Sequence, residues 1–116
     1  MRAELKSMHS PDIDLPTFWP EKPDSFGFLM QVMIGPEGQE GTESFDIQVC
    51  TPKWLIEKHK PDDVLFGTHM LIVFEYDVQR IQGFIQRYCQ RCIGNSWQDI
   101  VPKLARIGGW EFEDYH

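Results

Sequence analysis

The chain has 116 residues, of which 41% are hydrophobic and 13% aromatic, and its formal net charge is −7. This length and composition fit one globular domain over residues 1–116, and the longest apolar run, residues 70–74, is too short to span a membrane. The acidic balance argues against nucleic acid as a partner and suits a basic protein. The first residues lack the apolar stretch of a secretory signal, so we expect a cytoplasmic location.

The N-terminal quarter of the chain is predicted to be a strand followed by a long loop. Apolar and polar residues alternate over residues 2–9, which is the period of a strand. Four prolines and no periodicity follow over residues 10–25. We expect an ordered or semi-ordered loop here, attached to the edge of the core by Phe18 and Trp19.

The next segment is predicted to be a β-hairpin. Residues 26–34 are apolar at nearly every position, and residues 42–50 provide the return strand. The glycine-rich tip between them, residues 35–41, opens a strand rather than a helix and contains no lysine. It therefore lacks the geometry and the charge of a phosphate-binding loop.

The rest of the chain is organised around residues 45–55. Alternation up to residue 50 predicts a core strand with one buried face. Thr51 is typical of a helix N-cap and Pro52 of a first helical residue, so a short helix should follow directly and end at Lys58. The residues expected to face the core are Phe45, Ile47 and Val49.

Residues 68–76 form the most apolar segment of the chain. Their centre, Met-Leu-Ile-Val-Phe, is apolar on both faces of a strand, which predicts a central position in the sheet. Asp77 should then cap a helix that ends at Gly94-Asn95. The residues expected to face inward recur at helical spacing: Val78, Ile81, Phe84, Ile85, Tyr88, Cys89 and Cys92.

A last helix and a last strand complete the predicted fold. Residues 96–99 resemble a capping box, and Pro102 would be tolerated if Asp99 were the true cap, since Pro102 would then lie in the first turn. Residues 110–115 alternate as a short strand. The sequence therefore predicts an α+β fold, with a mostly antiparallel sheet of about five strands and two to three helices packed on it.

Charge is distributed unevenly along the chain. Residues 78–107 carry five basic residues and a single acidic one, Asp99, so the acidic excess lies in the strands, loops and tail. We therefore expect a charged partner to dock away from the C-terminal helices.

No motif in the sequence predicts catalysis, a metal site or a cofactor. Cys89 and Cys92 lack the second pair that a structural zinc site needs, and they lie at a helix end, where the helix dipole raises a thiol pKa. The four histidines are scattered, without metal-ligand spacing. We expect the cysteines to be packing residues and the histidines to be solvated or packed at an edge of the core.

Two clusters of aromatic and acidic residues are the best candidates for a binding surface, because interfaces that capture basic proteins combine aromatic anchors with carboxylates. The first flanks Tyr76, and the second is at the end of the chain. A turn with paired aspartates follows the short helix. The candidate residues are Asp62, Asp63, Glu75, Asp77, Trp110, Glu111, Glu113 and Asp114. The alternative is that the aromatic residues pack inward and the acids merely face water.

Several segments together resemble the immunity protein 8 family of bacterial polymorphic toxin systems. The most specific are Cys50-Thr-Pro-Lys-Trp-Leu55 and Trp110-Glu-Phe-Glu-Asp114. The supporting segments are residues 3–7, 9–12, 26–29, 34–36, 43–47, 71–77 and 107–115. They follow one another in order over nearly the whole chain.

The resemblance implies a non-enzymatic α+β protein that binds and neutralises, in the cytosol, the C-terminal domain of a toxin encoded beside it. It implies no catalytic residues and no cofactor, and many toxins of such systems are nucleases. Inhibition would plug the toxin active site or block substrate access beside it. Two other functions stay open: a small enzyme that uses buried carboxylates or a histidine in a cleft, and a general protein-interaction module.

Overall fold

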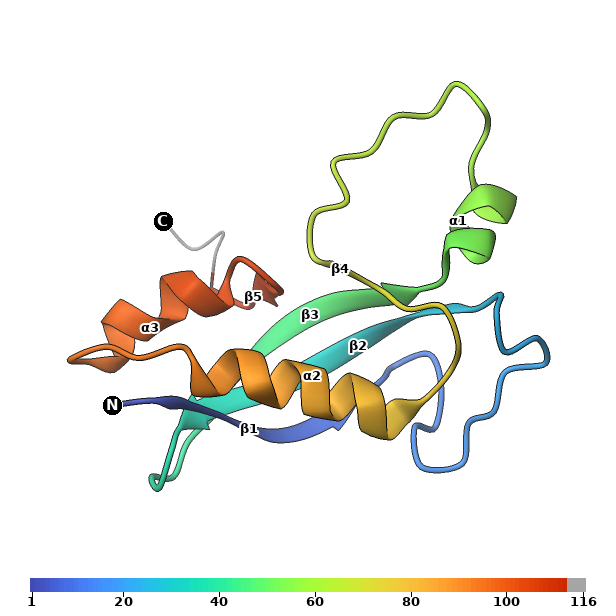
Figure 1. The fold of residues 1–116 in the computed structure, drawn as a ribbon. Coiled ribbons are helices and arrows are strands. Elements are labelled where there is room, and N and C mark those ends of the chain that lie inside the picture. Colours follow the sequence, from blue (N-terminus) through green and yellow to red (C-terminus); the bar gives the residue numbers. More distant parts are fainter. Residues whose placement is uncertain (113–116) are drawn as a thin grey trace.

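The computed structural model describes residues 1–112, which fold into a five-stranded sheet with three helices (Figure 1). The strands are β1 (Ala3–His9), β2 (Gly27–Pro36), β3 (Glu43–Cys50), β4 (Met70–Ile72) and β5 (Gly109–Trp110). The helices are α1 (Pro52–Lys58), α2 (Val78–Gln90) and α3 (Trp97–Leu104). This mostly antiparallel sheet with its helices confirms the predicted α+β class.

Strand β3 is the centre of the sheet. It pairs along its whole length with β2, as the predicted hairpin requires, and β1 follows on the far side of β2. Its other edge is shared, because β5 pairs antiparallel with its first half and β4 pairs parallel with its last three residues. The expectation that the chain is organised around residues 45–55 is therefore confirmed.

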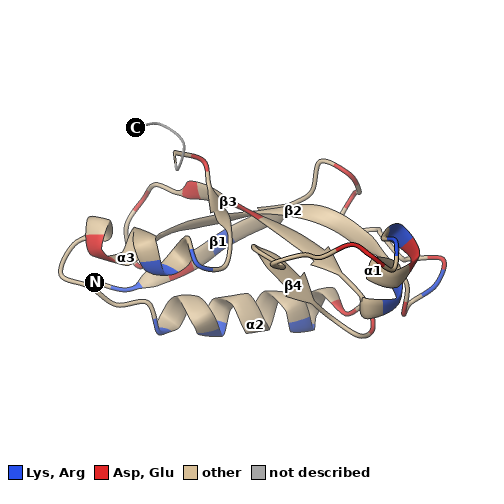
Figure 2. Cartoon of the chain, turned by 90° about the horizontal axis from the view of Figure 1, so that it is seen from above, with Lys and Arg blue, Asp and Glu red and all other residues tan. Residues whose placement is uncertain are grey.

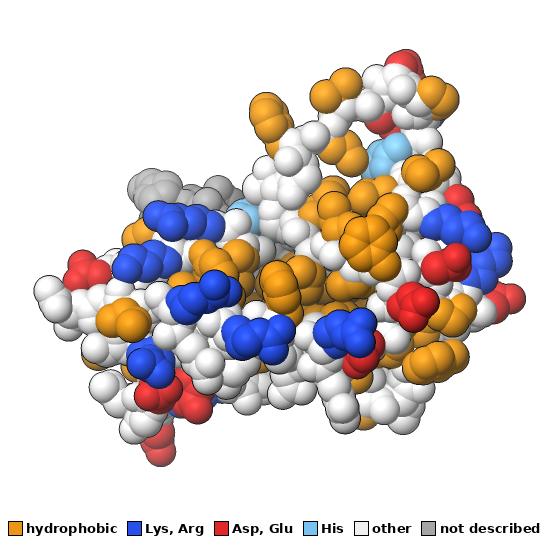
Figure 3. Space-filling view, viewed as in Figure 1, with side chains coloured by type: hydrophobic (Ala, Val, Ile, Leu, Met, Phe, Trp, Pro, Cys, Tyr) orange, Lys and Arg blue, Asp and Glu red, His pale blue; other side chains and the backbone are white. Residues whose placement is uncertain are grey.

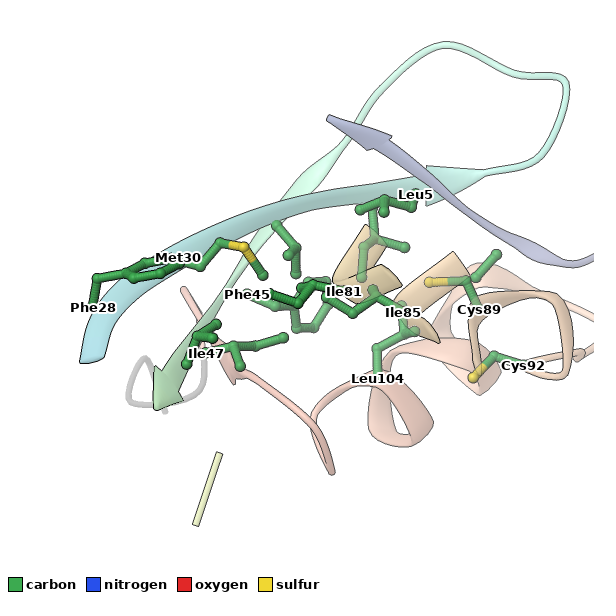
Figure 4. Packing of buried hydrophobic residues seen from close by; sticks show 14 of the residues in the cluster. Leu5, Phe28, Met30, Phe45, Ile47, Ile81, Ile85, Cys89, Cys92 and Leu104 are labelled. Carbon is green, nitrogen blue, oxygen red and sulfur yellow. The ribbon is translucent and has the colours of Figure 1, made fainter. Parts of the chain in front are cut away.

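The core lies between one face of the sheet and the helices α2 and α3 (Figure 4). Alternate residues of β2 and β3 are buried on this face, which is the period-2 pattern of a sheet with one covered side. The largest fully buried side chains include Phe45, Met30, Ile34, Ile47, Ile100 and Leu104.

The turn from β3 into α1 is built as the sequence predicts. The Thr51 hydroxyl accepts a hydrogen bond from the Trp54 N–H at 3.2 Å and another from the Phe26 N–H at 3.2 Å. Thr51 thus caps the helix and ties it to the neighbouring strand. A Cβ atom at Gly27 would collide with the Trp54 ring, so the absence of a side chain there lets α1 approach the sheet.

Both longer helices start at capping residues that the sequence predicts. Asp77 accepts a hydrogen bond from the Arg80 N–H at 3.0 Å, and Asp99 accepts one from the Ser96 N–H at 3.2 Å. Helix α2 ends at Gln90, before the predicted Gly94. The prediction for Pro102 is wrong: Ser96 is the cap, so the proline lies inside α3, where its exposed ring does not disturb the core.

The prediction of a central strand over residues 68–76 is wrong. Only Met70–Ile72 form a strand, and this strand is at the edge of the sheet, paired with β3 alone among the described strands (Figure 1). The apolar run does not indicate burial on both faces. Instead, part of it is exposed to solvent, with Phe74 74% exposed.

The other predictions for strands and loops need small corrections or none. A bulge between Leu5 and Ser7 shifts the register of β1, so Ser7 is exposed rather than continuing the inward face. The final strand contains only Gly109–Trp110; residues 111–112 form a turn, and residues 113–115 of the prediction lie outside the described part. Phe18 does hold the proline-rich loop to the core, through edge contacts with the rings of Phe28 and Tyr76.

Candidate functional site

Two residues just before strand β4 are in the left-handed backbone region. Gly67 has φ 70° and His69 has φ 57°, a value that few residues other than glycine adopt. The His69 ring holds this conformation in place, because its Nε2 atom donates a hydrogen bond to the Ala105 carbonyl at 2.8 Å. A carbonyl can only accept, so the proton must be on Nε2. The histidine thus links the start of β4 to the end of α3.

The outer edge of β4 has no partner strand among residues 1–112. The His69 carbonyl accepts from the Gln48 N–H at 2.9 Å, and the Val73 N–H donates to the Cys50 carbonyl at 2.9 Å. Because backbone groups alternate in direction along a strand, the N–H and C=O of Ile72 point away from β3. They are available to another chain.

A groove of about 330 Å³ runs between β4 and α2. Leu71 and Val73 form its floor on the side of the sheet, and Phe84 forms its wall on the side of α2. A second hollow continues it toward α3 and shares Leu71 and Phe84 with it. We call the first of these hollows the β4 groove. In Figure 3, apolar side chains gather at the centre of this face.

The apolar side chains around the β4 groove are accessible to solvent. Ile72 is 48% exposed, Phe74 74% and Phe84 55%. The sequence predicts Phe84 to face inward, which is wrong, because α2 buries the stripe of Ile81, Ile85 and Cys89 instead. Exposed apolar residues gathered at one place mark a surface for another molecule more often than scattered ones do.

Glu75 and Asp77 line the β4 groove, so the structure brings together two of the predicted binding residues. Asp77 is partly engaged as the helix cap, and its second carboxylate oxygen lies 3.8 Å from the Arg80 Nε atom. Glu75 is exposed and has no hydrogen bond or ion pair with another residue of the described range. It is the carboxylate best placed to meet a basic group at this site.

Asp62 and Asp63 lie in a different place, the loop over residues 59–69 that leads from α1 to β4 (Figure 1). Asp63 accepts a hydrogen bond from the Lys60 N–H at 2.9 Å and lies 3.3 Å from the His59 ring. Neither aspartate lines the β4 groove. The same loop presents Val64 and Phe66 almost completely to solvent, which the sequence analysis did not foresee.

The side chains of Trp110 and Glu111 form hydrogen bonds within the chain. The Trp110 indole N–H donates to Glu43 at 3.0 Å, and the Trp97 indole donates to the same carboxylate at 3.1 Å. Glu111 accepts from the Ser44 N–H at 3.1 Å. Glu113 and Asp114 lie outside the described residues. The link between the two tryptophans and Glu43 has no sequence signal, because these residues are far apart in the chain.

The cysteines are buried away from the β4 groove. Burial, and to a smaller extent the neighbouring Cys92, together raise the pKa of the Cys89 thiol to about 12. Cys92 donates its S–H to the Tyr88 carbonyl at 3.3 Å. A raised pKa keeps a thiol protonated and therefore a poor nucleophile or metal ligand. Residues 1–112 contain no group of three histidine, cysteine or acidic side chains arranged to hold a metal ion.

Charged residues are distributed unevenly over the elements (Figure 2). Basic residues recur along α2, whereas α1 and the loops near it carry both signs, and most acidic residues lie in the strands and loops. In Figure 3, a row of basic side chains borders the apolar centre on its α2 side. The uneven distribution read from the sequence is therefore present on the surface of the protein.

Comparisons with known proteins place this chain in one family. The family model described as Immunity protein 8 matches residues 3–115. Neither a curated protein nor a solved structure matches the chain. No helix in the described range has the length and apolar character that crossing a membrane requires. Because the family match extends over nearly the whole sequence, the chain belongs to the immunity protein 8 family.

Proposed function

We propose that this chain binds the toxin domain encoded beside it and neutralises that domain in the cytosol. Membership of a family of immunity proteins supports this role. The observation that carries it is the surface around β4, where exposed apolar side chains lie next to the carboxylates of Glu75 and Asp77. Apolar anchors with charged groups at their border are what protein-binding surfaces are made of.

We further propose that the toxin domain is basic and acts as a nuclease. The net charge of −7 supports this choice, since an enzyme that holds nucleic acid needs a positive surface. The carboxylates of Asp62, Asp63, Glu75 and Asp77 would steer such a domain toward the face that carries β4. The basic side chains of α2 and α3 would repel it from the neighbouring region.

Inhibition would follow from the position of the inhibitor rather than from chemistry. A bound acidic domain of this size blocks the path of a large substrate, and its carboxylates occupy the groups that would otherwise bind phosphates. The competing enzyme function would require Glu75, Asp77 and a histidine in one cleft. However, no histidine lines the β4 groove, and Asp77 is already engaged as a helix cap.

Co-expression tests the proposed function. Cells that produce the neighbouring toxin domain should survive when they also produce this chain, and they should die when they produce an immunity protein of a different toxin instead. Purified toxin domain and this chain should co-elute as one complex. Death of the co-expressing cells, with both proteins present at normal levels, would contradict the proposal.

The proposed electrostatic steering has its own test. Association of oppositely charged proteins reaches about 10⁸–10⁹ M⁻¹s⁻¹ at low salt, compared with about 10⁵–10⁶ M⁻¹s⁻¹ without steering. Stopped-flow measurements with the inactivated toxin domain should therefore show an association rate that falls steeply as salt is added, with little change in the dissociation rate. An association rate independent of salt would exclude a basic toxin surface as the docking partner.

A further inference from the structure

We propose that the open edge of β4 is the docking site itself, and that the toxin domain adds a short extended segment of its own chain to this edge as an additional strand. The inference rests on the proposed function and assigns it to a specific surface. The segment would have apolar side chains at alternate positions and a lysine or arginine at one end.

The backbone at the outer edge of β4 is open to pairing with another chain. Ile72 lies in a paired strand, yet its N–H and C=O point outward and meet no other strand of the described chain. An extended peptide can bond to these groups without any rearrangement of the sheet. Strand addition of this kind obtains affinity from backbone hydrogen bonds and specificity from pockets for every second side chain.

The β4 groove lies beside this edge and offers apolar contacts to an added strand. Side chains of an added strand alternate between the two faces of the sheet, so every second one would enter the groove. There they would contact Leu71, Val73 and Phe84, all of them apolar. Phe74 and Phe84 are more than half exposed in the free chain, and both would lose contact with water on binding.

Charge also favours this edge. Glu75 lies three residues after the end of β4 and lacks a partner in the described chain. A basic side chain at the corresponding end of the segment would pair with it. Glu75 would therefore favour one direction of the added strand, because the reversed segment would place its basic end toward the second hollow, which Arg106 lines. Arg80 also lines the β4 groove, but it lies 3.8 Å from the Asp77 carboxylate, which offsets its charge.

The shape of the molecule favours a narrow segment over a second copy of this chain. The loop over residues 59–69 and helix α1 both extend beyond the edge of β4 (Figures 1 and 2). A two-fold pairing of two β4 edges would drive this loop of each copy into the sheet of the other. A single short strand or hairpin tip of the toxin domain would not bring a second copy of this loop to the edge.

The first test removes the hydrogen-bond donor. In Ile72→Pro the lost N–H points away from β3, and proline is tolerated at such positions of an edge strand. Titration calorimetry with the inactivated toxin domain should show binding weakened about tenfold or more, the usual result at the centre of an interface. The thermal unfolding midpoint of the free variant identifies any loss of folding.

Two further pairs of variants change side chains only and leave the backbone hydrogen-bonding groups in place. Ile72→Ala should weaken binding, and Ile93→Ala is its matched control, because Ile93 is 50% exposed but lies after α2, in an isolated bridge with Arg2. In the same way Glu75→Lys should weaken binding, and Glu40→Lys at the tip of the hairpin should not. Equal effects within both pairs would overturn the proposal.

The outcomes separate this inference from the function on which it rests. If the unmodified chain neither binds nor protects, the proposed function fails. If it binds and protects, and the β4 variants bind equally well, only the docking site is wrong. If the chain alone sediments as a dimer that Ile72→Pro dissociates, the occupant of the edge is a second copy, and the proposal is overturned in favour of self-association.

Discussion

The two edges of the sheet are built in opposite ways. At the β1 edge, the outward N–H of Leu5 donates to the side chain of Gln86 at 3.0 Å, and the N–H of Ala3 donates to the Cys92 carbonyl at 3.1 Å. Charged residues and a bulge add to this protection. Helix α2 and the turn that follows it therefore cover this edge.

The β4 edge has none of these devices. Residues 70–74 contain no charge, no proline and no bulge, and helix α2 lies across the sheet nearer to β1. Exposed, unprotected strand edges promote unwanted association, so natural proteins normally block them. The sheet thus covers its β1 edge and leaves the three-residue β4 edge without a partner strand among residues 1–112. This difference is the basis for assigning the docking site.

The largest expected effect is a difference in stability between variants of two neighbouring residues of α2. Ile85 is almost fully buried under the sheet, and Ile85→Ala should lower the free energy of unfolding by about 2–5 kcal/mol. Phe84 faces the β4 groove, and Phe84→Ala should change stability by less than about 0.5 kcal/mol but weaken toxin binding. Urea unfolding and calorimetry measure the two quantities. Similar stability losses would mean that the groove belongs to the core.

The next effect concerns the covered edge. Gln86→Leu removes the acceptor for the Leu5 N–H and leaves that donor without its partner at a largely buried position. The expected cost is about 1–3 kcal/mol of unfolding free energy. Gln90→Leu, at an exposed position of the same helix, is the control and should be close to neutral. If the two variants have the same free energy of unfolding, the hydrogen bond from Leu5 to Gln86 does not stabilise the β1 edge.

Alkaline pH should lower the free energy of unfolding, because the Cys89 thiol of α2 is buried. The Cys89 thiol ionises near its ordinary pKa of 9.0 in the unfolded chain, whereas burial raises its pKa to about 12 in the folded one. Between these values the unfolded state binds fewer protons, so stability falls as pH rises, by about 1.4 kcal/mol per pH unit above 9 for one such group. Urea unfolding at pH 8 and pH 10 should show the loss, and Cys89→Ala should reduce it. A stability independent of pH would contradict the burial of this thiol.

The smallest effect distinguishes the structural role of Asp77 from its role in binding. Asp77→Ala removes the cap of α2 and should cost about 0.5–2 kcal/mol, while Asp77→Asn retains an acceptor and should cost much less. If the charge also steers the toxin, Asp77→Asn should slow association without lowering the unfolding midpoint. Equal association rates for Asp77→Asn and the unmodified chain would limit Asp77 to its structural role.

The helix starts and the central strand could be predicted because their signals lie within a few residues of one another in the sequence. Thr51, Asp77 and Ser96 each mark a helix start through a bond to a residue three positions later, so the sequence alone contains the information. The alternation of Phe45, Ile47 and Val49 identified the central strand for the same reason. Pro102 was misplaced because helix position depends on which of two nearby polar residues serves as the cap.

The site could be predicted only in part, because exposure is a tertiary property. Glu75 and Asp77 were candidates because of their position after an apolar segment, and both line the β4 groove. The apolar run itself was assigned to the centre of the sheet, since hydrophobicity does not reveal whether a partner covers a strand within the same chain or in another molecule. For Phe84, helical spacing does not distinguish the core stripe from the border beside it.

Amide hydrogen exchange is the most direct test of the contrast between the two edges. In the free chain, the Leu5 amide should exchange slowly because Gln86 binds it, and the Ile72 amide should exchange rapidly. On addition of the inactivated toxin domain, the account predicts strong new protection of Ile72 and little change at Leu5. A complex in which the Ile72 amide still exchanges as fast as in the free chain would contradict it.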